Sequence, residues 1–147
     1  MVSRRSVKVL IGSALVGLLL SSVQAAEMLP KQMSGRWTAE TPRGPMSDVW
    51  SVEIDSQDGG GAISGRVSHV GISCGAKDEP MQGTFDGSTL VITSQLRAGV
   101  NSAQAKGNCQ GGKITWTLKA KEGTQSFEGE ANLEGPRQVK VVVTLGP

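Results

Sequence analysis

The chain has 147 residues, with 15 basic and 13 acidic side chains, 20 glycines, two cysteines and one histidine. This length fits one domain with a sizeable core. The near balance of charge, without a run of Lys or Arg, argues against nucleic acid or an anionic membrane surface as a partner.

The first 25 residues have the layout of a secretory signal peptide. Three basic residues precede an apolar stretch at 9–23, and Val23 and Ala25 take the positions that a signal peptidase reads. The apolar stretch is shorter than the roughly 20 residues that span a bilayer, so we expect removal and not a retained anchor. Export by the Sec route is favoured over the twin-arginine route. The mature protein is then expected in the periplasm or outside the cell.

Cleavage after Ala25 leaves 122 of the 147 residues: an N-terminal arm at 26–33 and a single domain at 34–147. The removed segment holds three of the 15 basic residues and no acidic one. The mature chain therefore has 12 basic and 13 acidic residues and a net charge of −1. A mature chain with this nearly neutral net charge is not expected to bind an anionic polymer.

Period-two alternation of apolar and polar residues predicts eight strands after the arm. In most of them one face is apolar and the other polar, which is typical of antiparallel sheet. The expected strands are Ser34–Glu40, Asp48–Asp55, Ala62–Val70, Pro80–Asp86, Ser88–Gln95, Lys113–Lys119, Gln125–Asn132 and Gln138–Leu145.

The connections alternate in length. Short, Gly-bearing turns are expected at 56–61, 86–87 and 121–124, and longer connections at 41–47, 71–79 and 96–112, with 134–136 the short exception among the latter. In an up-and-down meander the two kinds lie at opposite ends. The prediction is an all-β protein, an eight-stranded antiparallel up-and-down barrel, with a flattened β-sandwich as the alternative. Gly65, Gly83 and Gly129 on inward positions suit the sharp bends of a closed barrel.

Cys74 and Cys109 lie in the third and fifth connections, both at the long-loop end. In an exported chain such a pair is predicted to form a structural disulfide. Closing a loop of about 35 residues would contribute about 3–4 kcal/mol of stability.

Gly35-Arg36-Trp37 resembles the G-x-W start of the first strand in calycins, the barrel group that contains lipocalins and avidins. The resemblance implies that Trp37 plugs the closed end of the barrel, at the short turns. No ligand residue of either family is carried over. Leu29-Pro30, followed by 33–37, also resembles the start of bacterial periplasmic inhibitors of secreted metalloproteases, whose N-terminal arm enters the protease cleft.

Few residues suggest catalysis. Gly71-Ile72-Ser73-Cys74-Gly75 matches the nucleophile elbow of α/β-hydrolases, but that motif needs a following helix and a later His, and the single His precedes it. We expect no enzyme, no catalytic residue and no cofactor. We also expect no metal site, because one His and two paired cysteines cannot form a nitrogen–sulfur ligand set. Six carboxylates without calcium-binding spacing are interpreted as solvated residues of turns and strand ends: Asp48, Asp55, Asp58, Asp78, Glu79 and Asp86.

Five residues lie on inward phases toward the long-loop mouth: Trp50, His69, Met81, Ser94 and Leu96. Together they would form an apolar pocket with a few polar groups, as small-molecule sites do. The competing interpretation is that they only fill the barrel. His69 is interpreted as a ligand-binding or haem-ligating imidazole, as a residue hydrogen-bonded to a loop carbonyl, or as a residue on the rim.

The sequence therefore predicts an exported, non-catalytic binding protein that takes a small apolar or amphipathic ligand at the mouth. The alternative is a protein-binding inhibitor of a secreted protease that acts through its loops or its N-terminal arm.

Overall fold

The computed structural model describes residues 27–41, 44–69, 75–96, 111–134 and 140–147. The expected signal peptide, both cysteines and most of the G-x-S-x-G segment lie outside the described residues. No helix long and apolar enough to cross a membrane occurs in the part of the chain that the structure describes.

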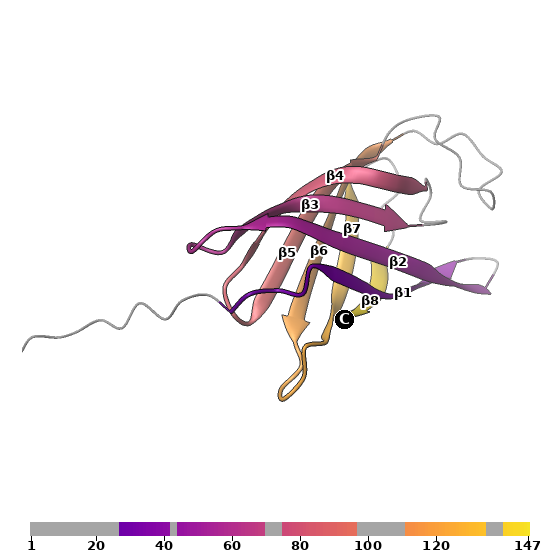
Figure 1. Cartoon of the computed structure of the whole chain (residues 1–147). Coiled ribbons are helices and arrows are strands. Elements are labelled where there is room, and N and C mark those ends of the chain that lie inside the picture. The colour runs from indigo at the N-terminus through magenta and orange to yellow at the C-terminus, as the bar shows by residue number, and fades with distance from the viewer. Residues whose placement is uncertain (1–26, 42–43, 70–74, 97–110, 135–139) are drawn as a thin grey trace, which may run out of the picture.

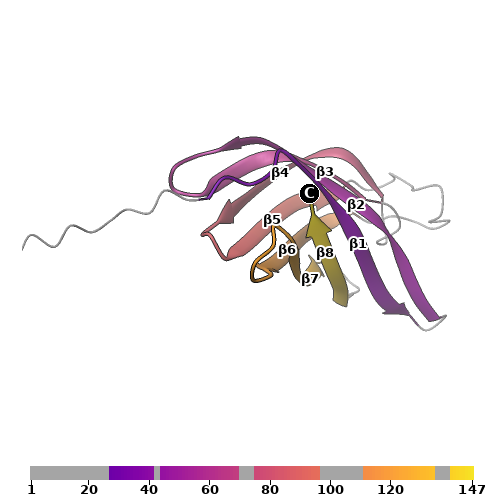
Figure 2. The same cartoon turned by 60° about the horizontal axis from the view of Figure 1, so that its bottom comes forward.

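Eight antiparallel strands follow one another around a closed barrel, and β8 pairs with β1 to close it (Figures 1 and 2). This confirms the predicted up-and-down barrel over the flattened sandwich. The strands are β1 (Gln32–Thr41), β2 (Gly44–Gln57), β3 (Ala62–His69), β4 (Ala76–Phe85), β5 (Thr89–Leu96), β6 (Gly112–Ala120), β7 (Phe127–Glu134) and β8 (Lys140–Gly146).

Alternation along each strand builds the core. In β6, for example, Ile114, Trp116 and Leu118 are fully buried while Lys113 and Lys119 are exposed. Burying such side chains stabilises the fold by roughly 1.5–3 kcal/mol each. The apolar core therefore lies inside the barrel.

Inward glycines allow neighbouring strands to approach closely. A Cβ on Gly65 would overlap the backbone carbonyl of Glu53, and a Cβ on Gly129 would overlap that of Thr117. Only a residue without a side chain fits these places, as expected where a closed sheet bends sharply.

Compact turns close one end of the barrel. In the β2–β3 turn, Asp58 Oδ1 accepts hydrogen bonds from the backbone N–H groups of Gly60 (2.9 Å) and Ala62 (2.8 Å). In the β4–β5 turn, Asp86 Oδ1 accepts from Thr89 N–H at 2.7 Å and Ser88 N–H at 2.9 Å. These hydrogen bonds lower the pKa of the Asp86 carboxyl, and the one from Thr89 N–H has the largest effect. Both aspartates are exposed turn residues, as the sequence predicted.

The connection between the first two strands differs from the prediction. Residues 41–47 were expected as a long loop, but β1 continues to Thr41 and β2 begins at Gly44. The two strands form a ribbon that reaches beyond the ends of their neighbours (Figures 1 and 2). Met46 is 46 % exposed there. A ribbon beyond the rim has no buried face, so its sequence shows no alternation that would reveal it as strand.

Trp37 is buried, but it lies midway along β1, opposite Asp48 and Val143, and not at the short-turn end that the resemblance to calycins implied. At the short-turn end, Phe85 and Phe127 meet edge to face with ring centroids 5.8 Å apart. These two phenylalanines are the aromatic pair that fills this end.

The described part of the N-terminal arm lies against the same end. Leu29 is buried, and its N–H donates to Gln57 Oε1 at 2.9 Å. The Gln57 amide in turn donates to the Glu27 carbonyl at 3.0 Å. Met28 remains 67 % exposed.

Candidate functional site

All five residues predicted to line the mouth point into the barrel and are buried: Trp50, His69, Met81, Ser94 and Leu96. Neighbouring strands bring them together in pairs. Trp50 on β2 lies opposite His69 on β3, and Met81 on β4 lies opposite Ser94 on β5. His69 and Leu96 are the last residues of their strands, at the long-loop end.

Trp116 on β6 meets the Trp50–His69 pair across the interior. Its ring stacks on Trp50, with centroids 5.3 Å apart and planes 12° from parallel. His69 meets the same ring edge-on, at 5.8 Å and 65°. The sequence placed Trp116 on an inward phase but did not mark it as a site residue. Alternation gives the face of a strand, and only the closed barrel shows which residues meet across it.

Several buried polar atoms of the inward-facing side chains have no hydrogen-bond partner. Within the described residues, both ring nitrogens of His69, Ser94 Oγ and Trp116 Nε1 are buried and unpaired. Trp50 differs, because its Nε1–H donates to the Thr144 carbonyl at 2.8 Å. Leaving a buried donor or acceptor unpaired costs about 1–3 kcal/mol. Three inward-facing side chains among apolar residues therefore have unused hydrogen-bonding capacity.

Burial lowers the pKa of His69 from 6.5 to about 4, because desolvation disfavours the charged imidazolium. The imidazole is therefore neutral at physiological pH and offers one donor and one acceptor. No group of three or more His, Cys, Asp or Glu side chains among the described residues is placed to hold a metal ion.

Glu79 is the one residue of the site region that the sequence interpretation placed wrongly. It was expected as a solvated residue in a connection, but β4 begins at Ala76 and the Glu79 side chain is buried, opposite Val67 of β3. The register shifts between Val67 and His69, and Asp78 has a positive φ of 50°. From Glu79 onward the alternation is regular, and Glu79 shares the inward phase of Met81 and Phe85. It was missed because the predicted strand began one residue later, at Pro80.

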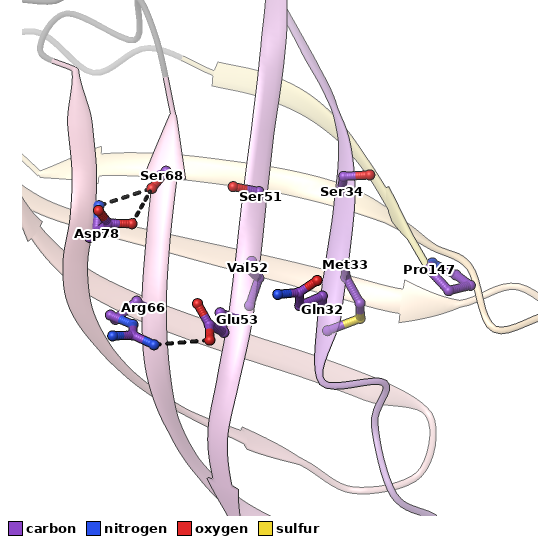
Figure 3. Close-up of a pocket in the computed structure, with 10 residues that line it drawn as sticks. All are labelled: Gln32, Met33, Ser34, Ser51, Val52, Glu53, Arg66, Ser68, Asp78 and Pro147. Atoms are coloured by element: carbon purple, nitrogen blue, oxygen red, sulfur yellow. Dashed lines mark hydrogen bonds and ion pairs between the residues drawn. The ribbon is translucent and has the colours of Figure 1, made fainter.

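A groove of about 470 Å³ lies on the outer wall, across β1 to β4 (Figure 3). Only short side chains line its floor, because Ser34, Ser51 and Ser68 stand in register on adjacent strands. Arg66 beside them pairs with Glu53 at 2.9 Å and with Asp55 at 3.3 Å. Ser68 Oγ accepts from the Asp78 N–H at 2.9 Å. Arg66 and Glu53 of this groove pair with each other and Asp78 bonds to Ser68, in contrast to the unpaired polar atoms of the interior.

The closed eight-stranded antiparallel barrel is compatible with a calycin-like fold. No protein-family model, curated protein or solved structure matches the chain. The barrel and its interior are therefore the basis for a functional assignment.

Proposed function

We propose that this protein is an exported, non-catalytic binding protein whose barrel takes up a small amphipathic molecule at the long-loop end. The observation that carries the proposal is the group of unpaired polar atoms on His69, Ser94 and Trp116, set among apolar side chains. Small-molecule sites combine these two features, since apolar walls provide affinity and a few polar groups fix orientation.

The energetics support binding over simple filling of the barrel. An apolar interior of the same shape would avoid the cost of about 1–3 kcal/mol for each unpaired polar group. A bound molecule with its own hydrogen-bonding groups would remove that cost. Trp50, Met81 and Leu96 around the polar atoms would bury its apolar part.

Native mass spectrometry of exported protein, purified without detergent or organic solvent, tests this proposal. We expect an additional non-covalent mass that disappears on mild denaturation. His69→Phe should lose most of it while keeping or raising the melting temperature, because a ring of similar shape replaces an unpaired polar group.

Phe85→Leu is the matched control. It changes a buried aromatic residue at the other end of the barrel and should retain the bound mass despite a lower melting temperature. Wild-type protein without any bound mass, or His69→Phe protein that binds as wild type does, would contradict the proposal.

The second candidate, inhibition of a secreted protease, is supported by the ordered arm and the exposed Met28. Such an inhibitor would bind through residues 27–31 and would tolerate His69→Phe. Deleting the arm would abolish protease binding but leave an interior ligand in place, so the two variants separate the candidates.

A further inference from the structure

We propose, on the basis of this binding function, that the buried end of the ligand carries an uncharged hydrogen-bond acceptor, a carbonyl or hydroxyl oxygen, that binds Trp116 Nε1–H. The ligand is then a molecule with a neutral oxygen acceptor, and Trp116 on β6 is a binding residue in addition to the five expected at the mouth.

The indole of Trp116 sets the requirement for an acceptor. An indole nitrogen can only donate a hydrogen bond, and Trp116 is 0 % exposed. The stacked Trp50 uses its own N–H on the Thr144 carbonyl and has no acceptor to offer. The contact of His69 with the ring of Trp116 is edge-on and leaves Nε1 without a partner. The ligand therefore has to bring the oxygen.

The charges around the site argue against an anionic oxygen. Every basic side chain whose burial the structure describes is exposed: Lys31, Arg36, Arg66, Lys77, Lys113, Lys119 and Lys121. Glu79, an acidic residue, is buried in the wall opposite Val67, the inward neighbour of His69. A carboxylate pressed against Trp116 would lose its hydration without gaining a described cation, which costs far more than burying a neutral oxygen.

A cationic end does not fit either. An ammonium or guanidinium group has donors only, so it would face the Trp116 N–H donor to donor. His69 and Ser94 each offer both a donor and an acceptor, so they fit a neutral hydroxyl or carbonyl in either orientation.

Three probes with the same phenylethyl group test the inference: benzylacetone (a ketone), butylbenzene (its deoxygenated hydrocarbon analogue) and hydrocinnamate (its carboxylate analogue). Indole N–H resonances in a two-dimensional nitrogen–proton NMR spectrum report on each tryptophan, and tryptophan fluorescence gives the dissociation constants. We expect benzylacetone to move the Trp116 indole resonance downfield. Butylbenzene should cause no downfield shift.

Trp116→Phe should weaken benzylacetone binding about 5- to 10-fold and butylbenzene binding by less than about twofold, since it removes one hydrogen bond and keeps a ring. Trp50→Phe is the matched control, because its lost N–H bonds the backbone and not the ligand. It should change both affinities by the same factor.

Hydrocinnamate that shifts the Trp116 resonance as benzylacetone does would overturn the inference, as would a benzylacetone affinity unchanged in Trp116→Phe. Either result leaves the proposed function intact, because a ligand still enters the barrel. If none of the probes binds but the purified protein carries a non-covalent mass, the inference is overturned and the proposed function stands. If it carries no such mass either, both are contradicted. If Trp116→Phe does not fold, the shift of the wild-type indole resonance decides.

Discussion

Two stacked tryptophans show how position gives the same residue different roles. Trp50 and Trp116 are both fully buried, but only Trp50 has a backbone carbonyl in reach of its N–H. The sequence predicted both as inward-facing, because alternation fixes the face of a strand. Partners across a barrel depend on its closure, which no local pattern records. For this reason the unpaired state of Trp116 emerged only from the structure.

His69 should make the barrel sensitive to acid. Its pKa is 6.5 in the unfolded chain and about 4 in the barrel, so the unfolded state binds the extra proton between these values. Stability is unaffected above pH 6.5, falls as the pH drops toward about 4, and does not change further through this group below that. The loss should reach about 3 kcal/mol.

Urea unfolding at several pH values measures this loss, with His69→Phe as control. The difference in free energy of unfolding between wild type and variant should widen from pH 6.5 to 4. Parallel pH curves for the two proteins would show that the imidazole is not desolvated in the folded state.

At the scale of the strands, all eight were predicted, and their errors lie where no face is buried or where a bulge interrupts the pattern. The β1–β2 ribbon around Met46 lies beyond the rim, and the bulge at Asp78 shifts the start of β4. Inward alternation was reliable elsewhere, because a one-residue slip would turn a whole strand inside out.

The bend in β7 should depend on Gly129. Its missing Cβ leaves room for the Thr117 carbonyl on β6, so Gly129→Ala forces the two strands apart. We expect a loss of about 1–3 kcal/mol in the free energy of unfolding. Gly59→Ala, in the open β2–β3 turn with no atom near its added Cβ, should change it by less than about 0.5 kcal/mol. Equal losses in both variants would show that crowding between the strands is not the cause.

For the whole molecule, the short turns and the arm close one end, and the connections at the other end carry both cysteines. Export would place these cysteines in an oxidising compartment. The intact mass of the exported protein should correspond to a start at or within two residues of Ala26. A mass that still includes Arg4 and Arg5 would exclude cleavage and, with it, the compartment on which a disulfide depends.

Cys74 and Cys109 are predicted to be bonded, and the topology supports this prediction. Cys74 follows β3 and Cys109 precedes β6, so both belong to connections at the same end of the closed barrel. A bond there would restrict the unfolded chain and contribute about 3–4 kcal/mol. Thiol titration of unfolded, non-reduced protein should find no free thiol, and reduction should lower the melting temperature to that of the Cys74→Ser/Cys109→Ser variant. Two titratable thiols would show that this constraint is absent. The stability of the long-loop end would then depend on strand pairing alone.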